Sequence, residues 1–153
     1  MLLALMACEG DRPVLLPQPE EATEMYGQAA TLSGNVLEVT VEVPPDRLQG
    51  GSLWARSTPY YYLFTVATRE LFVRYPDLAA VRVVTRGTDG QEIARATLSQ
   101  ADLNAVTWNH MIAYASLAQT QGTDEPSHVA KLVREAEDVL SNYRYSPRYT
   151  ATR

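Results

Sequence analysis

The residues that could support catalysis or hold a metal ion are few. A nucleophile requires a neighbouring base, and a metal site requires several ligands within reach. The chain has two histidines, His110 and His128, and a single cysteine, Cys8. The histidines fall on different predicted helices without an HxxxH or HxxE spacing, and the sequence lacks P-loop, GxGxxG, GxSxG and CxxC motifs. We therefore predict a protein that is not an enzyme and that needs no metal ion or cofactor.

The histidines and the paired carboxylates are readily explained by structure. His110 follows the apolar positions of a predicted helix, where a lone histidine is typical of the core or of an interface hydrogen bond. His128 follows Ser127 in the first turn of another predicted helix, and we expect it to be exposed. Glu137 and Asp138 are adjacent, and neighbours on a helix point about 100° apart, so spacing alone does not make them an acid/base pair.

Charge is unevenly distributed along the 153 residues, whose net charge is −5. Residues 1–35 carry five acids and one base, whereas residues 139–153 carry three arginines and no acid. The acidic balance argues against nucleic acid as a partner. The acidic front and the basic tail can pair within the chain, between copies or with a partner, or they can remain two solvated ends.

The start of the chain carries the one resemblance to a known class of protein. The run Leu5-Met6-Ala7-Cys8 resembles the lipobox of bacterial lipoproteins, in which the cysteine is lipidated. Prolines and acids follow it, and this composition favours an extended linker. The resemblance implies lipid attachment at Cys8 and a membrane-anchored protein on the periplasmic or extracytoplasmic face of the bacterial cell envelope. A buried structural thiol is the alternative interpretation of Cys8.

Periodicity predicts three strands and three helices in the body of the chain. Residues 36–43 alternate apolar and polar side chains, and Gly87 to Gly90 form a hairpin turn between two further strands. Ser57-Thr58-Pro59 is typical of a helix start, and residues 99–102 resemble a capping box. The predicted strands cover 36–43, 80–86 and 91–98, and the predicted helices cover 57–75, 102–119 and a segment that follows Pro126.

These elements define an α+β fold class. We expect a single small β-α-β-β-α-α domain over 34–142, with a three-stranded sheet packed by helices. The strand, helix and second strand can form a right-handed crossover if the two strands are parallel. An extended N-terminal arm over 1–33 and an irregular C-terminal tail over 143–153 complete the expected organisation.

Three surfaces are candidates for partner binding. The predicted helix over 102–119 is apolar almost all round, so the sheet and the last helix cover it or one side awaits a partner. The tail interleaves tyrosines and arginines, which are frequent in binding hot spots, although a disordered tail is the alternative. The loop and helix start around 50–62 hold a third aromatic group. The predicted partner-binding residues are Trp54, Tyr60, Tyr61, Tyr143, Arg144, Tyr145, Arg148 and Tyr149.

Together these observations lead to a first hypothesis and an alternative. We expect a non-catalytic envelope protein that serves as a peripheral, accessory subunit of a larger membrane-associated complex, such as a respiratory, photosynthetic or secretion assembly. Its partners would be protein subunits of that complex and, through the lipid anchor, the membrane surface. The alternative is a standalone lipoprotein domain that binds a small ligand or an envelope polymer between the sheet and the uncharged helix.

Overall fold

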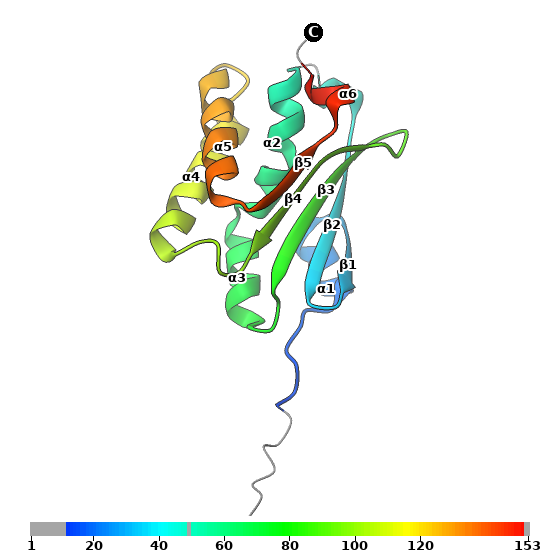
Figure 1. The fold of residues 1–153 in the computed structure, drawn as a ribbon, viewed down its shortest axis with the longest axis vertical. Coiled ribbons are helices and arrows are strands. Elements are labelled where there is room, and N and C mark those ends of the chain that lie inside the picture. The colour runs from blue at the N-terminus through cyan, green and yellow to red at the C-terminus, as the bar shows by residue number, and fades with distance from the viewer. Residues whose placement is uncertain (1–11, 49, 152–153) are drawn as a thin grey trace, which may run out of the picture.

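The computed structural model describes residues 12–48 and 50–151, so Cys8 and the lipobox-like run lie outside the described residues. The described chain forms an α+β fold in which helices pack on one mixed sheet (Figure 1). Its elements are, in order, α1 (Pro19–Tyr26), β1 (Ala29–Ser33), β2 (Val36–Val43), the 3-10 helix η1 (Pro45–Leu48), α2 (Ser52–Leu63), α3 (Val66–Arg74), β3 (Ala80–Gly87), β4 (Glu92–Ser99), α4 (Ala105–Gln121), α5 (Pro126–Val139), β5 (Asn142–Tyr145) and α6 (Pro147–Thr150).

The sheet has five strands in the order β1-β2-β3-β4-β5, so the expectation of a three-stranded sheet is wrong. β1 pairs antiparallel with β2, and β5 pairs antiparallel with β4. Both edge strands come from the segments that we expected to be an extended arm and an irregular tail. β1 escapes prediction because its sequence AATLS has few β-branched or aromatic residues. β5 escapes prediction because it is only four residues long, although its tyrosines alternate with polar residues.

The three strands expected from the sequence are confirmed as β2, β3 and β4. β2 and β3 are parallel, with Val39 opposite Val83, so α2 and α3 lie on the connection that crosses between them. β3 and β4 are antiparallel and are joined by the expected turn, in which Gly90 has a φ of 78°. This left-handed conformation favours glycine because it has no Cβ.

The sequence predicts one helix over 57–75, but the chain forms two, α2 and α3. α2 begins earlier than expected, so Pro59 lies inside it instead of in its first turn. Proline cannot donate to the helical ladder, and the neighbouring hydroxyl of Thr58 donates to the carbonyl oxygen of Trp54 at 2.9 Å. The chain leaves the helical path after α2, and the side chain of Thr65 caps α3.

The two later helices follow the predicted pattern, with one shifted start. α4 begins after Asn104, whose side-chain oxygen accepts a hydrogen bond from the N–H of Thr107 at 2.9 Å. Asp102 accepts a hydrogen bond from the N–H of Ser99, as in a capping box, but this bond closes a turn ahead of the helix. α5 begins at Pro126, the residue that the predicted helix follows. Most of the apolar stripe of α5 is buried.

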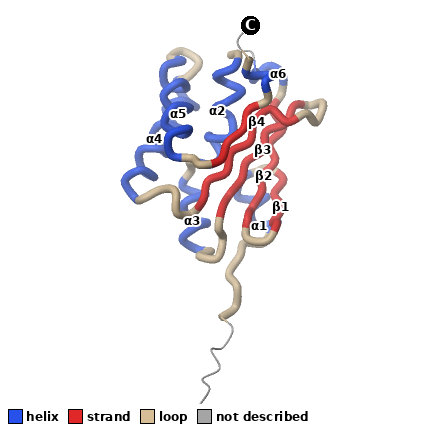
Figure 2. The backbone as a smooth tube through the Cα atoms, in the orientation of Figure 1, coloured by secondary structure: helices blue, strands red, loops and turns tan. Residues whose placement is uncertain are grey.

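The helices lie on one side of the sheet, and the opposite face, turned to the viewer in Figure 2, carries no helix of the described chain. α2 packs on β3, β4 and α5, and α4 packs on α5. The core lies between this helical layer and the sheet, where alternate strand residues meet α2. The largest fully buried side chains include Tyr60, Phe64, Leu37, Leu63, Leu71, Leu78, Ile93, Leu98, Met111 and Leu132.

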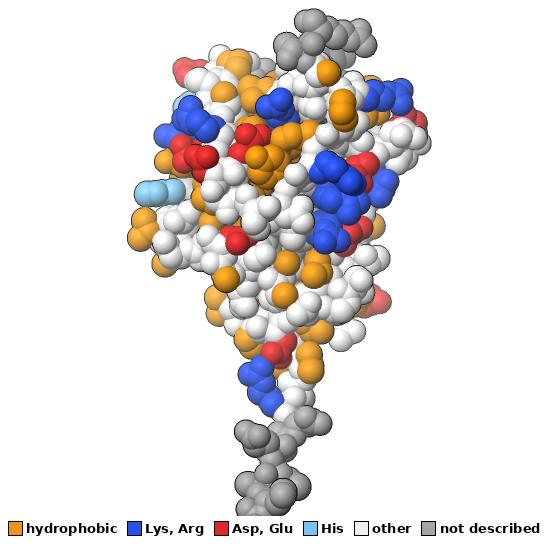
Figure 3. Space-filling model, in the orientation of Figure 1, with side chains coloured by type: hydrophobic (Ala, Val, Ile, Leu, Met, Phe, Trp, Pro, Cys, Tyr) orange, Lys and Arg blue, Asp and Glu red, His pale blue; other side chains and the backbone are white. Residues whose placement is uncertain are grey.

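The open face of the sheet is covered by paired charges (Figure 3). A guanidinium nitrogen of Arg82 lies 3.4 Å from a carboxylate oxygen of Glu38. Glu92 accepts hydrogen bonds from Arg95 and Arg144, at 2.8 Å and 2.9 Å. Partial burial would raise the pKa of Glu92, but these two arginines outweigh it and hold that pKa below its ordinary value. This face is therefore internally satisfied.

The C-terminal segment is fastened to the core by a chain of hydroxyls. The Tyr145 hydroxyl donates to Glu137 at 2.9 Å and is hydrogen-bonded to the hydroxyl of Tyr60. Tyr60 is fully buried, and burial raises the pKa of both tyrosines above the ordinary tyrosine value. Tyr145 therefore provides the hydrogen-bond partner that the buried Tyr60 requires.

We expect Tyr145→Phe to lower the free energy of unfolding by about 1–3 kcal/mol, because it leaves the buried Tyr60 hydroxyl without this partner. Tyr60→Phe removes the buried hydroxyl itself and keeps the bond between Tyr145 and Glu137, so its cost should be about 1 kcal/mol or less. Urea denaturation followed by far-ultraviolet circular dichroism measures both. Equal losses in the two variants would contradict the proposed hydroxyl chain.

Candidate functional site

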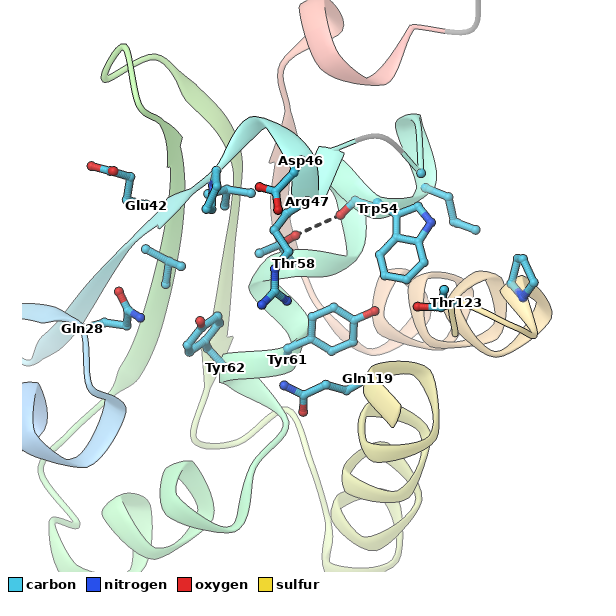
Figure 4. Close-up of a pocket in the computed structure, with 16 residues that line it drawn as sticks. Gln28, Glu42, Asp46, Arg47, Trp54, Thr58, Tyr61, Tyr62, Gln119 and Thr123 are labelled. Atoms are coloured by element: carbon cyan, nitrogen blue, oxygen red, sulfur yellow. Dashed lines mark hydrogen bonds between the residues drawn. The ribbon is translucent and has the colours of Figure 1, made fainter. Parts of the chain in front are cut away.

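The main pocket of the described chain has a volume of about 890 Å³ and lies beside α2. Its walls come from the carboxyl end of β2, the helix η1, one side of α2 along its length and the carboxyl end of α4 (Figure 4). The volume is within the roughly 300–1,000 Å³ that is typical of small-molecule sites. The polar and aromatic residues that line it are Gln28, Glu42, Asp46, Arg47, Trp54, Thr58, Tyr61, Tyr62, Gln119 and Thr123.

The burial of Tyr60 determines which residues of α2 face this pocket. Tyr60 points into the core, and the next residue on a helix is turned by about 100°. Tyr61 and Tyr62 therefore leave the core, and both are half-buried along the pocket wall. Figure 4 shows Tyr61 on the side of Trp54 and Thr123, and Tyr62 closer to Gln28.

Trp54 occupies its position because Gly50 has no side chain. A Cβ atom on Gly50 would lie 1.6 Å from the Cδ1 atom of the Trp54 indole, so any other residue at position 50 would collide with the ring. Gly51 follows with a φ of 79° and is the N-cap of α2. The two glycines thus allow the loop to bring the indole onto the pocket wall.

The charged groups of the pocket are not engaged by the rest of the described protein. Glu42, Asp46 and Arg47 form no ion pair or side-chain hydrogen bond with another described residue, and Arg47 extends from η1 toward Tyr61 (Figure 4). On the open sheet face, by contrast, arginine and glutamate side chains are paired with one another. The side chains of Asp46 and Arg47 are therefore available to a ligand, whereas the Thr58 hydroxyl of the same pocket donates to the carbonyl oxygen of Trp54.

The Tyr61 hydroxyl is buried and has no hydrogen-bond partner in geometric range among the described residues. Ser57 lies beside it, but the Ser57 hydroxyl donates to the carbonyl oxygen of Trp54 at 3.1 Å. Burial raises the pKa of Tyr61, so the hydroxyl keeps its proton at neutral pH. A buried polar group without a partner costs free energy and is a common feature of functional sites.

The residues first considered for chemistry lie elsewhere. His110 is exposed on α4, so the expectation of a core position is wrong. Its imidazole ring lies close to the ring of Tyr114. His128 is half-buried instead of exposed, and its Nε2 atom lies 3.8 Å from Glu125. Among the described residues, no group of three or more His, Cys, Asp or Glu side chains could hold a metal ion.

The structure separates the predicted partner-binding residues into two groups. Trp54 and Tyr61 line the pocket, whereas Tyr60 is buried in the core. The tail residues lie on β5 and α6, where Tyr145 is bonded to Tyr60 and Arg144 is paired with Glu92. Tyr143 is 39% exposed, Arg148 is exposed, and Tyr149 packs against the core. Contact of any of these residues with a partner stays a prediction.

Several pocket residues have no distinctive signal in the sequence. Gln28, Glu42, Asp46 and Arg47 belong to segments that read as linker, solvated strand face and loop. Gln119, however, ends the uncharged helix that we considered as one wall of a ligand site. That helix also carries exposed apolar side chains on the side away from the core, where Val106 is 64% exposed and Leu117 is 38% exposed.

Comparisons with known proteins do not assign this chain to a family. No protein-family model matches the chain, and neither the curated proteins nor the solved structures yielded a match. Within residues 12–48 and 50–151, no helix has the length and apolar character needed to span a bilayer.

We expect Tyr61→Phe to leave the free energy of unfolding unchanged or to raise it by up to about 1 kcal/mol, because it removes an unpartnered buried hydroxyl. Tyr26→Phe is the matched control. Burial raises the pKa of Tyr26 to about 12, and its hydroxyl is hydrogen-bonded to Thr68 at 2.7 Å, so this variant should lose about 1 kcal/mol. Chemical denaturation measures both, and an equal loss in Tyr61→Phe would show that its hydroxyl is satisfied.

Proposed function

We propose that this protein is a non-catalytic binding domain of the bacterial cell envelope, which holds a small polar ligand or a segment of an envelope polymer in the pocket beside α2. The observation that carries the proposal is the combination of three aromatic side chains with charged groups that no described residue engages. Such lining, with a few convergent polar groups, is typical of ligand sites.

Binding at this pocket is favoured over a role as an accessory subunit, which was the first hypothesis. That hypothesis relied in part on the tail, in which Tyr145 is instead bonded to the core, while Tyr143 remains exposed. The exposed apolar side of α4 is the feature that still favours a protein partner. The two roles are compatible, but the pocket offers both the shape and the free polar groups of a binding site.

Membrane attachment through Cys8 would leave this pocket accessible. Arg12 and the N–H of Leu15 bind the carboxylate of Asp77, at the end of the molecule from which the N-terminal segment departs (Figure 1). The carboxyl end of β2 and the start of α2 lie at the opposite end (Figure 1). A lipid on Cys8 would therefore direct the pocket away from the membrane. The lipobox-like run supports this placement on the extracytoplasmic face of the membrane.

The pocket proposal is tested by nuclear magnetic resonance with small polar compounds, namely sugars, amino acids, amines and organic acids. We expect at least one class to shift the amide signals of residues that line the pocket, such as those of Arg47, Trp54 and Gln119. Gly50→Ala should weaken this binding, because the added Cβ displaces the indole of Trp54. If no class shifted the pocket signals, the proposal would be rejected.

The envelope placement is tested by fractionating cells that express the full chain or its Cys8→Ser variant. We expect the wild type in the membrane fraction and the variant in the soluble fraction, because the variant has no cysteine to carry a lipid anchor. After gentle solubilisation, size-exclusion chromatography separates the two roles. Elution as a small particle is expected for a standalone binding domain, whereas co-elution with a large complex would favour the accessory-subunit hypothesis.

A further inference from the structure

The lining of the pocket defines the chemical class of its ligand. We propose that the pocket binds a short neutral oligosaccharide, with a sugar ring against Trp54 or Tyr61 and its hydroxyls on the free polar groups. This inference rests on the proposed function, because it names the ligand of the same site. It is carried by three properties of the lining: aromatic area, mixed hydrogen-bonding capacity and a small net charge.

The aromatic side chains provide flat apolar surfaces for stacking. Trp54 comes from the first turn of α2, Tyr61 and Tyr62 come from its last turn, and all three border one pocket (Figure 4). The face of an aromatic ring is electron-rich, and the C–H groups on one face of a sugar ring carry partial positive charge, so the two surfaces attract each other. More than one aromatic side chain along the pocket suits a ligand with more than one ring.

The polar side chains offer both donors and acceptors, as sugar hydroxyls require. Each hydroxyl donates one hydrogen bond and accepts others. Asp46 supplies a carboxylate acceptor and Arg47 supplies guanidinium donors, whereas the carboxylate of Glu42 points away from the other lining residues (Figure 4). Gln28 and Gln119 supply amides, each with a donor and an acceptor. These groups form no ion pair or side-chain hydrogen bond with another described residue. Binding a sugar would therefore break no ion pair of the described protein.

The charge of the lining disfavours ionic ligands of either sign. The two ionic side chains near the aromatic rings, Asp46 and Arg47, have opposite charges that sum to zero, and the carboxylate of Glu42 points away from them (Figure 4). A phosphate or carboxylate ligand would be attracted by Arg47 but repelled by Asp46. A quaternary ammonium ion suits an aromatic cage, but it cannot accept from Arg47 and would be repelled by it. A neutral polyhydroxy ligand has neither disadvantage.

Isothermal titration calorimetry and amide chemical shifts test the inference with three kinds of probe. The neutral probes are chitotriose, maltotriose and cellotriose, the anionic probe is trigalacturonate, and the cationic probe is choline. We expect at least one neutral trisaccharide to bind with a dissociation constant of millimolar or lower and to shift signals of Trp54, Tyr61 and Arg47. Trigalacturonate and choline should bind more weakly than that trisaccharide.

Two variants locate the binding and control for general effects. Trp54→Ala should weaken trisaccharide binding by about tenfold, because it removes a stacking surface. Tyr143→Ala removes an exposed aromatic side chain on β5, outside the pocket lining, and should change the affinity by less than about twofold. Circular dichroism of each variant confirms that it is folded.

The remaining outcomes separate this inference from the proposed function. Binding of choline or trigalacturonate in the pocket, without binding of a neutral trisaccharide, would overturn the saccharide assignment and keep the pocket as a ligand site. Absence of pocket binding by every probe would overturn the saccharide assignment, and the broader screen above would then decide the proposed function. Trisaccharide binding that both Trp54→Ala and Tyr61→Ala leave unchanged would place the sugar elsewhere and overturn the inference.

Discussion

The full burial of Tyr60 is the constraint on which the other features of this protein depend. Because β2 and β3 are parallel, the chain between them must cross the sheet, and α2 makes the first part of that crossing. The large aromatic side chain of Tyr60, in the last turn of α2, fixes the rotation of the helix about its axis. The same rotation sends Tyr61 and Tyr62 to the pocket wall. It also creates a buried hydroxyl, which the C-terminal segment satisfies through Tyr145.

Polar groups in this protein have two different environments. On the open face of the sheet, the guanidinium groups of Arg82 and Arg144 are paired with Glu38 and Glu92. In the pocket, charged and amide groups remain free, and the hydroxyl of Tyr61 lacks a bond. Groups that lower stability or leave it unchanged are typical of functional sites, and the buried hydroxyl of Tyr61 is such a group in the pocket beside α2.

Local patterns predict the central elements, and long-range pairing determines the rest. The alternation in β2, the turn before β4 and the apolar stripe of α5 are strong local signals, and each element lies where the sequence places it. β1 and β5 are short, and their stability comes from pairing with β2 and β4. A local sequence pattern does not predict such long-range pairing. Similarly, aromatic composition draws attention to Trp54 and Tyr61, but only the fold brings Arg47 and Gln119 to the same pocket.

The most direct test of the pocket as a ligand site is a crystal structure of the protein soaked with a neutral trisaccharide. We predict electron density for a sugar ring stacked on Trp54 or Tyr61, with its hydroxyls within hydrogen-bonding distance of Asp46, Arg47 or Gln119. Density for the sugar at another place on the surface, with ordered water alone between α2 and the carboxyl end of β2, would contradict this assignment.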